Sequence, residues 1–280
     1  MEKVLKAEAF SPSGASHLLS LPTRVDKAHT ALLVIDMQND FCAPGGYIQR
    51  VLGKDITHCG AIVPKVQTLI ESARSTGVPV LWLRACYRPE LIPACMQAKL
   101  AQQGITDICC DRDSWGYDWY GVKPHPSETV VEKHSYDGFV GTSLERELRA
   151  RHVRTLVFAG VQTNICVEAT LRHAHALGYH CVVPEDCVAS HTPQAHEATL
   201  NNVRFLLGDV TRADDIIAYW RAPARLIYLD YTQEELDRAY DQRAWADNRD
   251  AILAWYAQAS AEARQESVHH RNVPYGPGKH

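Results

Sequence analysis

The chain has 280 residues, of which 46% are hydrophobic and 22% are charged, and its formal net charge is −4. These values are ordinary for a globular protein and allow one large α/β domain, or a domain of about 200 residues with an appendage. No basic block lies beside aromatic residues and no apolar run is long enough to span a membrane, so neither nucleic acid nor a membrane is expected as a partner. The nine cysteines form no CxxC pair and the N-terminus lacks a signal-peptide core, which predicts a cytoplasmic protein with free thiols.

Apolar runs typical of buried strands alternate along the chain with stretches of helical periodicity. We expect strands at 30–35, 78–83, 129–132, 155–159 and 181–184, and helices at about 61–75, 142–151, 166–177 and 193–207. The second of these helices begins with a capping-box pattern, Thr142 followed by Glu145. The alternation predicts a three-layer α/β/α fold with a doubly wound, mostly parallel sheet.

The character of the chain changes after about residue 222. Thr232 is expected to cap one helix, and residues 248–264 place several apolar side chains on one face of another. We therefore divide the chain into a domain at 1–225 and a helical C-terminal extension at 226–280. That apolar face must be buried, so the extension either covers the site or forms an interface with another subunit.

Polar groups follow three of the predicted strands, at the sheet edge where ligands bind in doubly wound folds. They are Asp36, Lys133 and the turn Gly160–Cys166. Cys166 begins a helix, where unpaired amides and the helix dipole favour a thiolate. Hydrolysis of an amide by a thiol needs a base, which Asp36 can supply, and donors for an oxyanion, which the helix-start amides can supply. Lys133 can hold both groups and lower the pKa of the thiol.

These segments carry a resemblance to a known family. The residues 31–41, 44–47, 132–133 and 160–170 closely resemble the isochorismatase-like cysteine hydrolase superfamily, and the resemblance covers about residues 26–220. The order of aspartate, lysine and cysteine along the chain is specific to that superfamily.

The resemblance implies a catalytic triad of Asp36, Lys133 and Cys166, with no cofactor. It also implies a cis peptide bond between Val161 and Gln162, which would direct the backbone amides of Gln162 and Cys166 into an oxyanion hole. Gly160 is expected to give this turn its room.

The branch of the superfamily follows from two further observations. Cys166 argues against the isochorismatases proper, which lack this nucleophile. No His or Asp lies between His58 and Asp107, where nicotinamidases carry their metal ligands, so no metal is expected. The remaining relatives are amidohydrolases of ureido and carbamoyl compounds, namely ureidoacrylate amidohydrolase, biuret and triuret hydrolases, and N-carbamoylsarcosine amidohydrolase. The chain looks most like the ureidoacrylate branch.

The expected substrate-binding residues come from the loops at the same sheet edge. Trp115 and Tyr136 are assigned by similarity to that branch, while Arg84 follows the second strand and its guanidinium would suit a planar carboxylate or urea. A solvated surface role for Arg84 is the alternative. The full expected set is Trp115, Tyr136, Gln38, Phe41, Arg84 and Tyr87.

The sequence thus predicts a metal-free cysteine amidohydrolase that cleaves a C–N bond of a small ureide through an acyl-thioester, as a homodimer or homotetramer. The alternatives are a hydrolase of another small amide, such as a carbamoylsarcosine-like compound or a hydrazide, and a catalytically idle subunit. Residues 231–243 and 272–278 are similar to the N-terminal cap of arylformamidase-like α/β-hydrolases. No nucleophile elbow follows them, so no second active site is expected.

Overall fold

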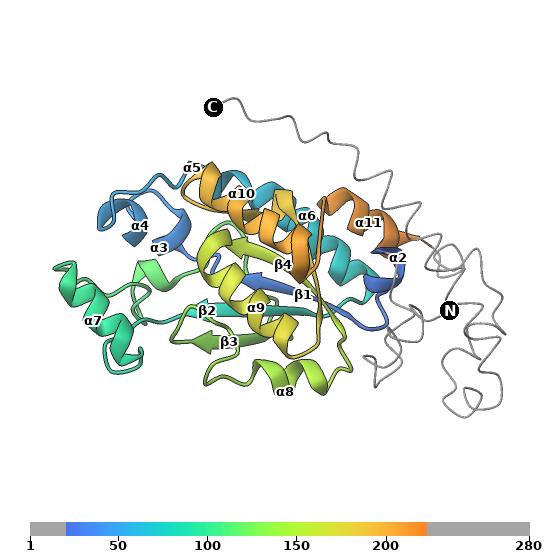
Figure 1. The fold of residues 1–280 in the computed structure, drawn as a ribbon, viewed down its shortest axis with the longest axis horizontal. Coiled ribbons are helices and arrows are strands. Elements are labelled where there is room, and N and C mark those ends of the chain that lie inside the picture. Colours follow the sequence, from blue (N-terminus) through green and yellow to red (C-terminus); the bar gives the residue numbers. More distant parts are fainter. Residues whose placement is uncertain (1–20, 223–280) are drawn as a thin grey trace. The chain divides into compact units, whose positions relative to one another are not determined.

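A parallel sheet brings together the strand ends that the sequence marks as functional (Figure 1). The computed structural model describes residues 21–222, and residues 25–221 form one compact unit. The strands are β1 (Thr30–Ile35), β2 (Val80–Ala85), β3 (Thr129–Lys133), β4 (Thr155–Val161), β5 (His180–Pro184), β6 (Val188–Ala189) and β7 (Asp209–Thr211). All strand pairs in this part of the chain are parallel, in the order β3-β2-β1-β4-β5-β7, with β6 beside β4.

Helices connect the strands of this unit and flank the sheet. They are α3 (Asn39–Cys42), α4 (Tyr47–Arg50), α5 (Thr57–Ala61), α6 (Val63–Thr76), α7 (Ala94–Gln102), α8 (Leu144–Arg149), α9 (Glu168–Ala176), α10 (Pro193–Asn202) and α11 (Ala213–Arg221). The short helix α2 (Leu21–Arg24) precedes the unit in the chain. Four shorter helical turns are η2 (Trp115–Tyr117), η3 (Thr163–Val167), η4 (Glu185–Cys187) and η5 (Val203–Leu207). None of the described helices could cross a membrane.

Helices cover both faces of the sheet, which is why its central strands are apolar throughout. Every residue of β1 and β4 is buried. Alternate residues of β1 such as Leu33 pack in one core cluster with Leu148 of α8, Leu171 of α9 and Leu200 of α10. Outside this cluster α6 and α11 pack against each other (Figure 1). Burial of each large aliphatic side chain stabilises the fold by about 1.5–3 kcal/mol. The predicted three-layer, doubly wound fold is confirmed.

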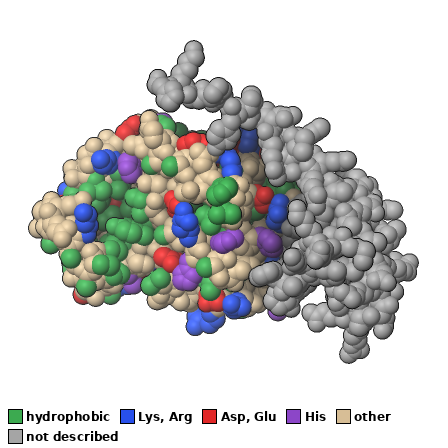
Figure 2. Space-filling model, in the orientation of Figure 1, with side chains coloured by type: hydrophobic (Ala, Val, Ile, Leu, Met, Phe, Trp, Pro, Cys, Tyr) green, Lys and Arg blue, Asp and Glu red, His purple; other side chains and the backbone are tan. Residues whose placement is uncertain are grey.

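The strand order also creates the site. From β1 the chain continues to β2 on one side of β1, whereas β4 lies on its other side. Because the strand order reverses at β1, the loops that follow β1 and β4 run in opposite directions. They leave a crevice at the carboxyl ends of these two strands. The arrowheads of β1, β2 and β3 point toward the end of the molecule that carries α3, α4 and α7 (Figure 1). Hydrophobic side chains gather on the visible surface at that same end (Figure 2).

Most expected elements are present, with three corrections. The helix expected from Cys166 is preceded by the π-helical turn η3, so Cys166 lies inside that turn and α9 begins two residues later. The capping box at Thr142 does not form as expected, because its hydroxyl accepts a hydrogen bond from the amide of Leu144 rather than Glu145. The helices α7 and α11 and the strand β7 are not among the expected elements.

Two other expectations concern the cysteines and the C-terminal extension. All nine cysteines are free, and only Cys95 is exposed, as expected for unpaired thiols in a core. The domain boundary at 225, the helices expected after Thr232 and at 248–264, and the resemblance at 231–243 and 272–278 lie outside the described residues.

Candidate active site

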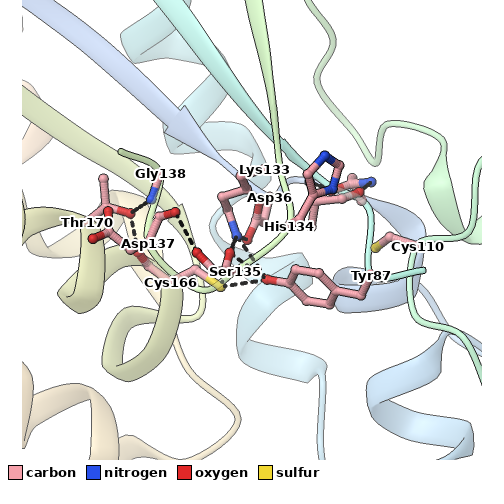
Figure 3. Close-up of polar contacts among 12 residues, drawn as sticks. Asp36, Tyr87, Cys110, Lys133, His134, Ser135, Asp137, Gly138, Cys166 and Thr170 are labelled. Carbon is pink, nitrogen blue, oxygen red and sulfur yellow. Dashed lines mark hydrogen bonds and ion pairs between the residues drawn. The ribbon is translucent and has the colours of Figure 1, made fainter. Parts of the chain in front are cut away.

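Asp36, Lys133 and Cys166 meet in one buried cluster (Figure 3). The ammonium nitrogen Nζ of Lys133 lies 2.9 Å from Oδ2 of Asp36 and donates a hydrogen bond to Sγ of Cys166 at 3.5 Å. Lys133 and Asp36 are fully buried, and Cys166 is 4% exposed. They follow or end β1, β3 and β4, so three separate strand ends deliver the three groups to one point.

Burial and charge act against each other in this cluster. Burial raises the pKa of Asp36, although the charge of Lys133 opposes this effect. Burial by itself would lower the pKa of Lys133, but the interactions with Asp36 and Cys166 together outweigh it and raise that pKa, so the side chain stays an ammonium.

The thiol of Cys166 is protonated at rest. Burial raises its pKa to about 12, while Lys133 lowers it and the charge of Asp36 raises it further. Lys133 therefore lowers the pKa of the thiol as expected, but desolvation has the larger effect, so the thiol needs a base such as Asp36 to become a thiolate. The raised pKa of Asp36 makes its carboxylate a stronger base than a free aspartate, beside the thiol whose proton it would accept.

Hydrogen bonds from the first turn of α9 fix the position of Cys166. The hydroxyl of Thr170 donates to the carbonyl oxygen of Cys166 at 2.7 Å and accepts from the amide of Gly138 at 3.0 Å (Figure 3). Gly138 is required here, because a Cβ at that residue would lie 2.3 Å from Cδ1 of Leu83. Thr170 belongs to the recognised motif, but its role as the link between α9 and the loop after β3 was not predicted.

Gly160 allows β4 to approach β1 directly below the cluster. Gly160 pairs with Ile35 in the sheet and has φ +113°. A Cβ at residue 160 would lie 2.0 Å from the carbonyl oxygen of Ile35, the residue before Asp36. No L side chain fits this space, which confirms the expected need for glycine.

The segment after Gly160 has the geometry that the resemblance implies. The peptide bond between Val161 and Gln162 is cis. The side-chain amide of Gln162 is 3% exposed and donates to Sγ of Cys59 at 3.3 Å. On the next turn the hydroxyl of Ser190 donates to the side-chain oxygen of Asn164 at 2.6 Å. Both contacts tie the η3 segment to neighbouring elements.

Three aromatic side chains extend from the cluster toward solvent. The ring of Tyr87 meets the rings of Phe41 and Tyr136 edge-on, with centroids 6.3 and 6.1 Å apart, and its hydroxyl accepts a hydrogen bond from Lys133 at 2.9 Å. Tyr136 is 44% exposed, and burial followed by the charge of Cys166 raises its pKa. The structure therefore brings these three expected residues to the catalytic cluster.

Gln38 is placed differently from the expectation. Its side-chain nitrogen donates to the carbonyl oxygens of Ala85 and Tyr117 at 3.1 and 3.0 Å, and its side-chain oxygen accepts from the amide of Ala85 at 2.8 Å. The side chain is fully buried and both of its donor hydrogens are used. Gln38 is thus a positioning residue that joins the ends of β1 and β2 to the η2 turn, rather than a substrate-binding residue.

Arg84 is also committed to protein contacts. Its guanidinium donates twice to the carbonyl oxygen of Tyr117, at 3.2 and 3.0 Å, and stacks on the ring of Tyr117 with Cζ 3.4 Å from the centroid. Asp118 lies 3.9 Å away and Trp119 covers the guanidinium at 5.0 Å. Two of the guanidinium N–H groups are therefore used within the protein, and the expected role of Arg84 in binding a substrate carboxylate stays a prediction.

Trp115 lies on the η2 turn with 53% of its surface exposed. Its carbonyl oxygen accepts from the side-chain amide of Asn39 at 2.8 Å. The next residue, Gly116, packs against the carboxylate of Asp40 so closely that a Cβ would lie 2.3 Å from it. The backbone of the turn is therefore fixed, and the indole is free to meet a ligand from the surface. Its part in substrate binding stays a prediction.

Two groups of residues among 21–222 could bring three ligand atoms to a metal. The first is Asp40, Cys109 and Cys110, and the second is Cys86, Glu132 and His134. The oxygens of Asp40 already accept from the amides of Tyr47 and Cys110, at 3.0 and 2.6 Å. The carboxylate of Asp40 therefore already has a structural role within the protein.

The carboxylate of Glu132, from the second group, is held by Arg112 and Tyr117. These protein donors compete with any ion for the same oxygens. The expectation of a metal-free enzyme remains a prediction.

Comparisons with known proteins agree with this geometry. Residues 30–215 match the isochorismatase domain family. The chain is 32% identical over 212 residues to the ureidoacrylate amidohydrolase of Methylobacterium radiotolerans, which covers 71% of this chain and 81% of that protein.

Solved structures give the same result. A cysteine hydrolase from Pseudomonas syringae pv. phaseolicola has a TM-score of 0.61 at 25% identity, covering 70% of this chain and 94% of that one. The N-carbamoylsarcosine amidase of Thermoplasma acidophilum has a TM-score of 0.55 at 27% identity, covering 66% and 97%. This chain therefore belongs to the isochorismatase family and is an amidohydrolase that acts on C–N bonds.

Proposed function

We propose that the chain hydrolyses a small ureido or carbamoyl compound by covalent catalysis, with Cys166 as nucleophile. The observation that carries this proposal is the buried contact of Lys133 with both Asp36 and Cys166, at 2.9 and 3.5 Å. A buried ammonium with a carboxylate and a thiol is costly to maintain, since each ion loses hydration worth several kcal/mol. Transfer of a proton between Cys166 and Asp36, beside the charge of Lys133, would explain why the protein maintains this cluster.

The reaction begins with transfer of the thiol proton of Cys166 to a carboxylate oxygen of Asp36. The thiolate forms an S–C bond with the substrate carbonyl, whose oxygen becomes negative. The backbone amides of Gln162 and Cys166 are the donors proposed for that oxyanion. The C–N bond then breaks, and the nitrogen leaves with the proton from Asp36 as ammonia or an amine.

Hydrolysis of the thioester returns the site to its starting state. Asp36 takes a proton from a water molecule, and the resulting hydroxide forms a bond to the thioester carbon. The C–S bond breaks, the acid or carbamate leaves, and the proton returns to Cys166. Lys133 remains charged throughout and balances the single negative charge, whether it is on the carboxylate, the sulfur or the oxyanion.

The substrate class rests on two supports. Relatives named for ureidoacrylate and N-carbamoylsarcosine both act on compounds with a carbamoyl nitrogen. The aromatic rings of Tyr87 and Tyr136 beside Cys166 suit a planar ureido group, which can lie against an aromatic face. N-carbamoylsarcosine-like compounds are the second candidate, favoured by the structural similarity to the amidase for that compound. A homo-oligomer and a cytoplasmic location remain predictions.

An ammonia-release screen tests the proposal. The panel contains ureidoacrylate, biuret, triuret, N-carbamoylsarcosine, allophanate, a hydrazide and simple amides. We expect turnover of ureido or carbamoyl members, and its complete loss in Cys166→Ala with an unchanged unfolding temperature. Cys181→Ala is the matched control, because Cys181 is also buried with a pKa raised to about 12, but its thiol donates to the carbonyl oxygens of Leu171 and Tyr179.

Cys181→Ala should keep the activity, and Cys166→Ala should not. Turnover retained in Cys166→Ala would refute covalent catalysis by this residue. Hydrolysis of simple amides alone would refute the ureido assignment. Elemental analysis of the active protein tests the absence of a metal, since bound zinc or iron at one equivalent would point to a nicotinamidase-type mechanism.

A further inference from the structure

Tyr87 touches the reacting sulfur, although no step of the proposed reaction uses it. Its hydroxyl oxygen lies 2.9 Å from Nζ of Lys133, 3.5 Å from Sγ of Cys166 and 3.3 Å from the carbonyl oxygen of Ser135 (Figure 3). The residue follows β2, so it reaches the cluster from a different strand end than the three triad residues. Its side chain is 7% exposed.

The neighbours of Tyr87 determine where its hydrogen points. The ammonium of Lys133 can only donate, so the tyrosine oxygen accepts from it and keeps its own hydrogen to give. The carbonyl oxygen of Ser135 can accept that hydrogen, but 3.3 Å is long for two oxygens, and it also accepts from Lys133 at 3.0 Å. The distance of 3.5 Å to Cys166 is ordinary for the larger sulfur atom. Once Cys166 is a thiolate, its charge makes the sulfur the stronger acceptor.

We propose that Tyr87 is a catalytic residue whose hydroxyl donates a hydrogen bond to the thiolate of Cys166, so that Tyr87 and Lys133 together hold the charged nucleophile. The inference rests on the proposed function. When the S–H proton moves to Asp36, the sulfur becomes a charged acceptor and its hydrogen bonds strengthen. Tyr87 keeps its proton throughout, and its bond to sulfur weakens as negative charge passes to the substrate oxygen.

The surroundings of Tyr87 keep it a donor. Burial raises its pKa well above the ordinary value, and the negative charges of Cys166, Asp36 and Cys109 act in the same direction. Tyr136 is the other titratable side chain in contact with its ring. Burial and the charge of Asp36 raise the pKa of Cys166. The charge of Lys133 and the hydrogen bond from Tyr87 both lower it.

The test removes one oxygen atom and needs no substrate. Tyr87→Phe keeps the ring that packs against Phe41 and Tyr136, so the fold should be retained. The rate of alkylation of Cys166 by iodoacetamide is measured against pH, with the labelled peptide identified by mass spectrometry. Tyr179→Phe is the matched control, because Tyr179 is also 7% exposed but stacks on Phe139 in the core.

We expect alkylation of Cys166 to be about tenfold slower in Tyr87→Phe than in the wild type at each pH, since a hydrogen bond to a charged group favours that charge by about a factor of ten or more. Turnover of any substrate found should fall about tenfold in kcat with little change in KM. Tyr179→Phe should follow the wild-type profile.

Coincident alkylation profiles of Tyr87→Phe and wild type, at equal unfolding temperatures, would overturn the inference, as would an equal slowing in Tyr179→Phe. If Tyr87→Phe does not fold, Tyr87→Met also lacks the hydroxyl and is read in the same way. A substrate screen without turnover would count against the proposed function and leave the alkylation comparison valid.

Discussion

Lys133 and Asp36 form a fully buried ion pair, with Nζ and Oδ2 2.9 Å apart, although 97 positions separate them in the sequence. Lys133→Met removes the cation and leaves the carboxylate of Asp36 buried alone. We expect the free energy of unfolding to fall by about 3–5 kcal/mol and turnover to be lost. The measurement is chemical denaturation of Lys133→Met, of Asp36→Asn and of the double variant.

The double variant should lose less stability than the sum of the two single changes, because each single change leaves a lone buried charge and the double variant leaves none. Lys65→Met is the control, since its ion pair with Asp214 is exposed and its loss should hardly change stability. Additive effects of Lys133→Met and Asp36→Asn would contradict a coupled pair.

Gly160→Ala tests the close approach of β4 to β1. The new Cβ would lie 2.0 Å from the carbonyl oxygen of Ile35, so the strand must shift and carry Asp36 with it. We expect a loss of stability of more than about 2 kcal/mol and a loss of activity of at least about tenfold. Gly178→Ala is the control, because Gly178 also has a positive φ, +92°, but nothing lies within 4 Å of its Cβ position.

Gly178→Ala carries only the conformational cost of a left-handed alanine, about 1–2 kcal/mol. Its activity per folded molecule should equal that of the wild type. The measurements are thermal unfolding and kcat/KM. Equal behaviour of Gly160→Ala and Gly178→Ala would show that the strand contact is unimportant.

Gln38→Met distinguishes a positioning residue from a substrate-binding one. The change leaves both backbone groups of Ala85 without their side-chain partner, while the carbonyl oxygen of Tyr117 keeps its hydrogen bonds from Arg84. Unpaired buried groups cost about 1–3 kcal/mol each, so the unfolding temperature should fall markedly. Gln67→Met, at an exposed site where the side chain contacts only Glu71, should leave it unchanged. A raised KM with unchanged stability would instead support the original substrate-binding role.

The dependence of kcat/KM on pH follows from Asp36. Asp36 must be unprotonated to accept the thiol proton, and burial raises its pKa above the ordinary 3.8. As the pH falls through this raised pKa, Asp36 binds a proton and activity is lost. The acid limb should therefore lie above about pH 4, while Lys133, with its pKa raised, causes no loss at mildly alkaline pH. An acid limb at or below pH 3.8, with the protein still folded, would contradict the assignment.

The sequence predicts the sheet and the triad well, because both depend on local patterns. The apolar runs at β1 and β4 are buried on both faces, and Asp36 and Lys133 lie directly at strand ends. The short, half-buried β7 has no such run. The apolar face of α11, with Ile216 and Trp220 buried, is present in the sequence and could have identified that helix.

Other features depend on contacts between distant residues. Tyr87 and Cys166 are 79 positions apart, and nothing near Tyr87 in the sequence indicates that its hydroxyl meets the sulfur. Arg84 and Tyr117 are 33 positions apart, so the sequence does not show that the guanidinium of Arg84 binds the carbonyl oxygen of Tyr117. The raised pKa of Cys166 cannot be predicted from sequence, because the position of a thiol in a helix does not reveal how deeply it is buried.

The covalent intermediate tests the central claim most directly. The protein is mixed with the best substrate of the screen, quenched in acid within milliseconds and examined by intact-mass and peptide mass spectrometry. The account predicts a mass increase equal to the acyl group of the substrate, located on Cys166 and absent from Cys166→Ala. Rapid turnover with no adduct at any quench time, together with full activity of Cys166→Ala, would contradict it.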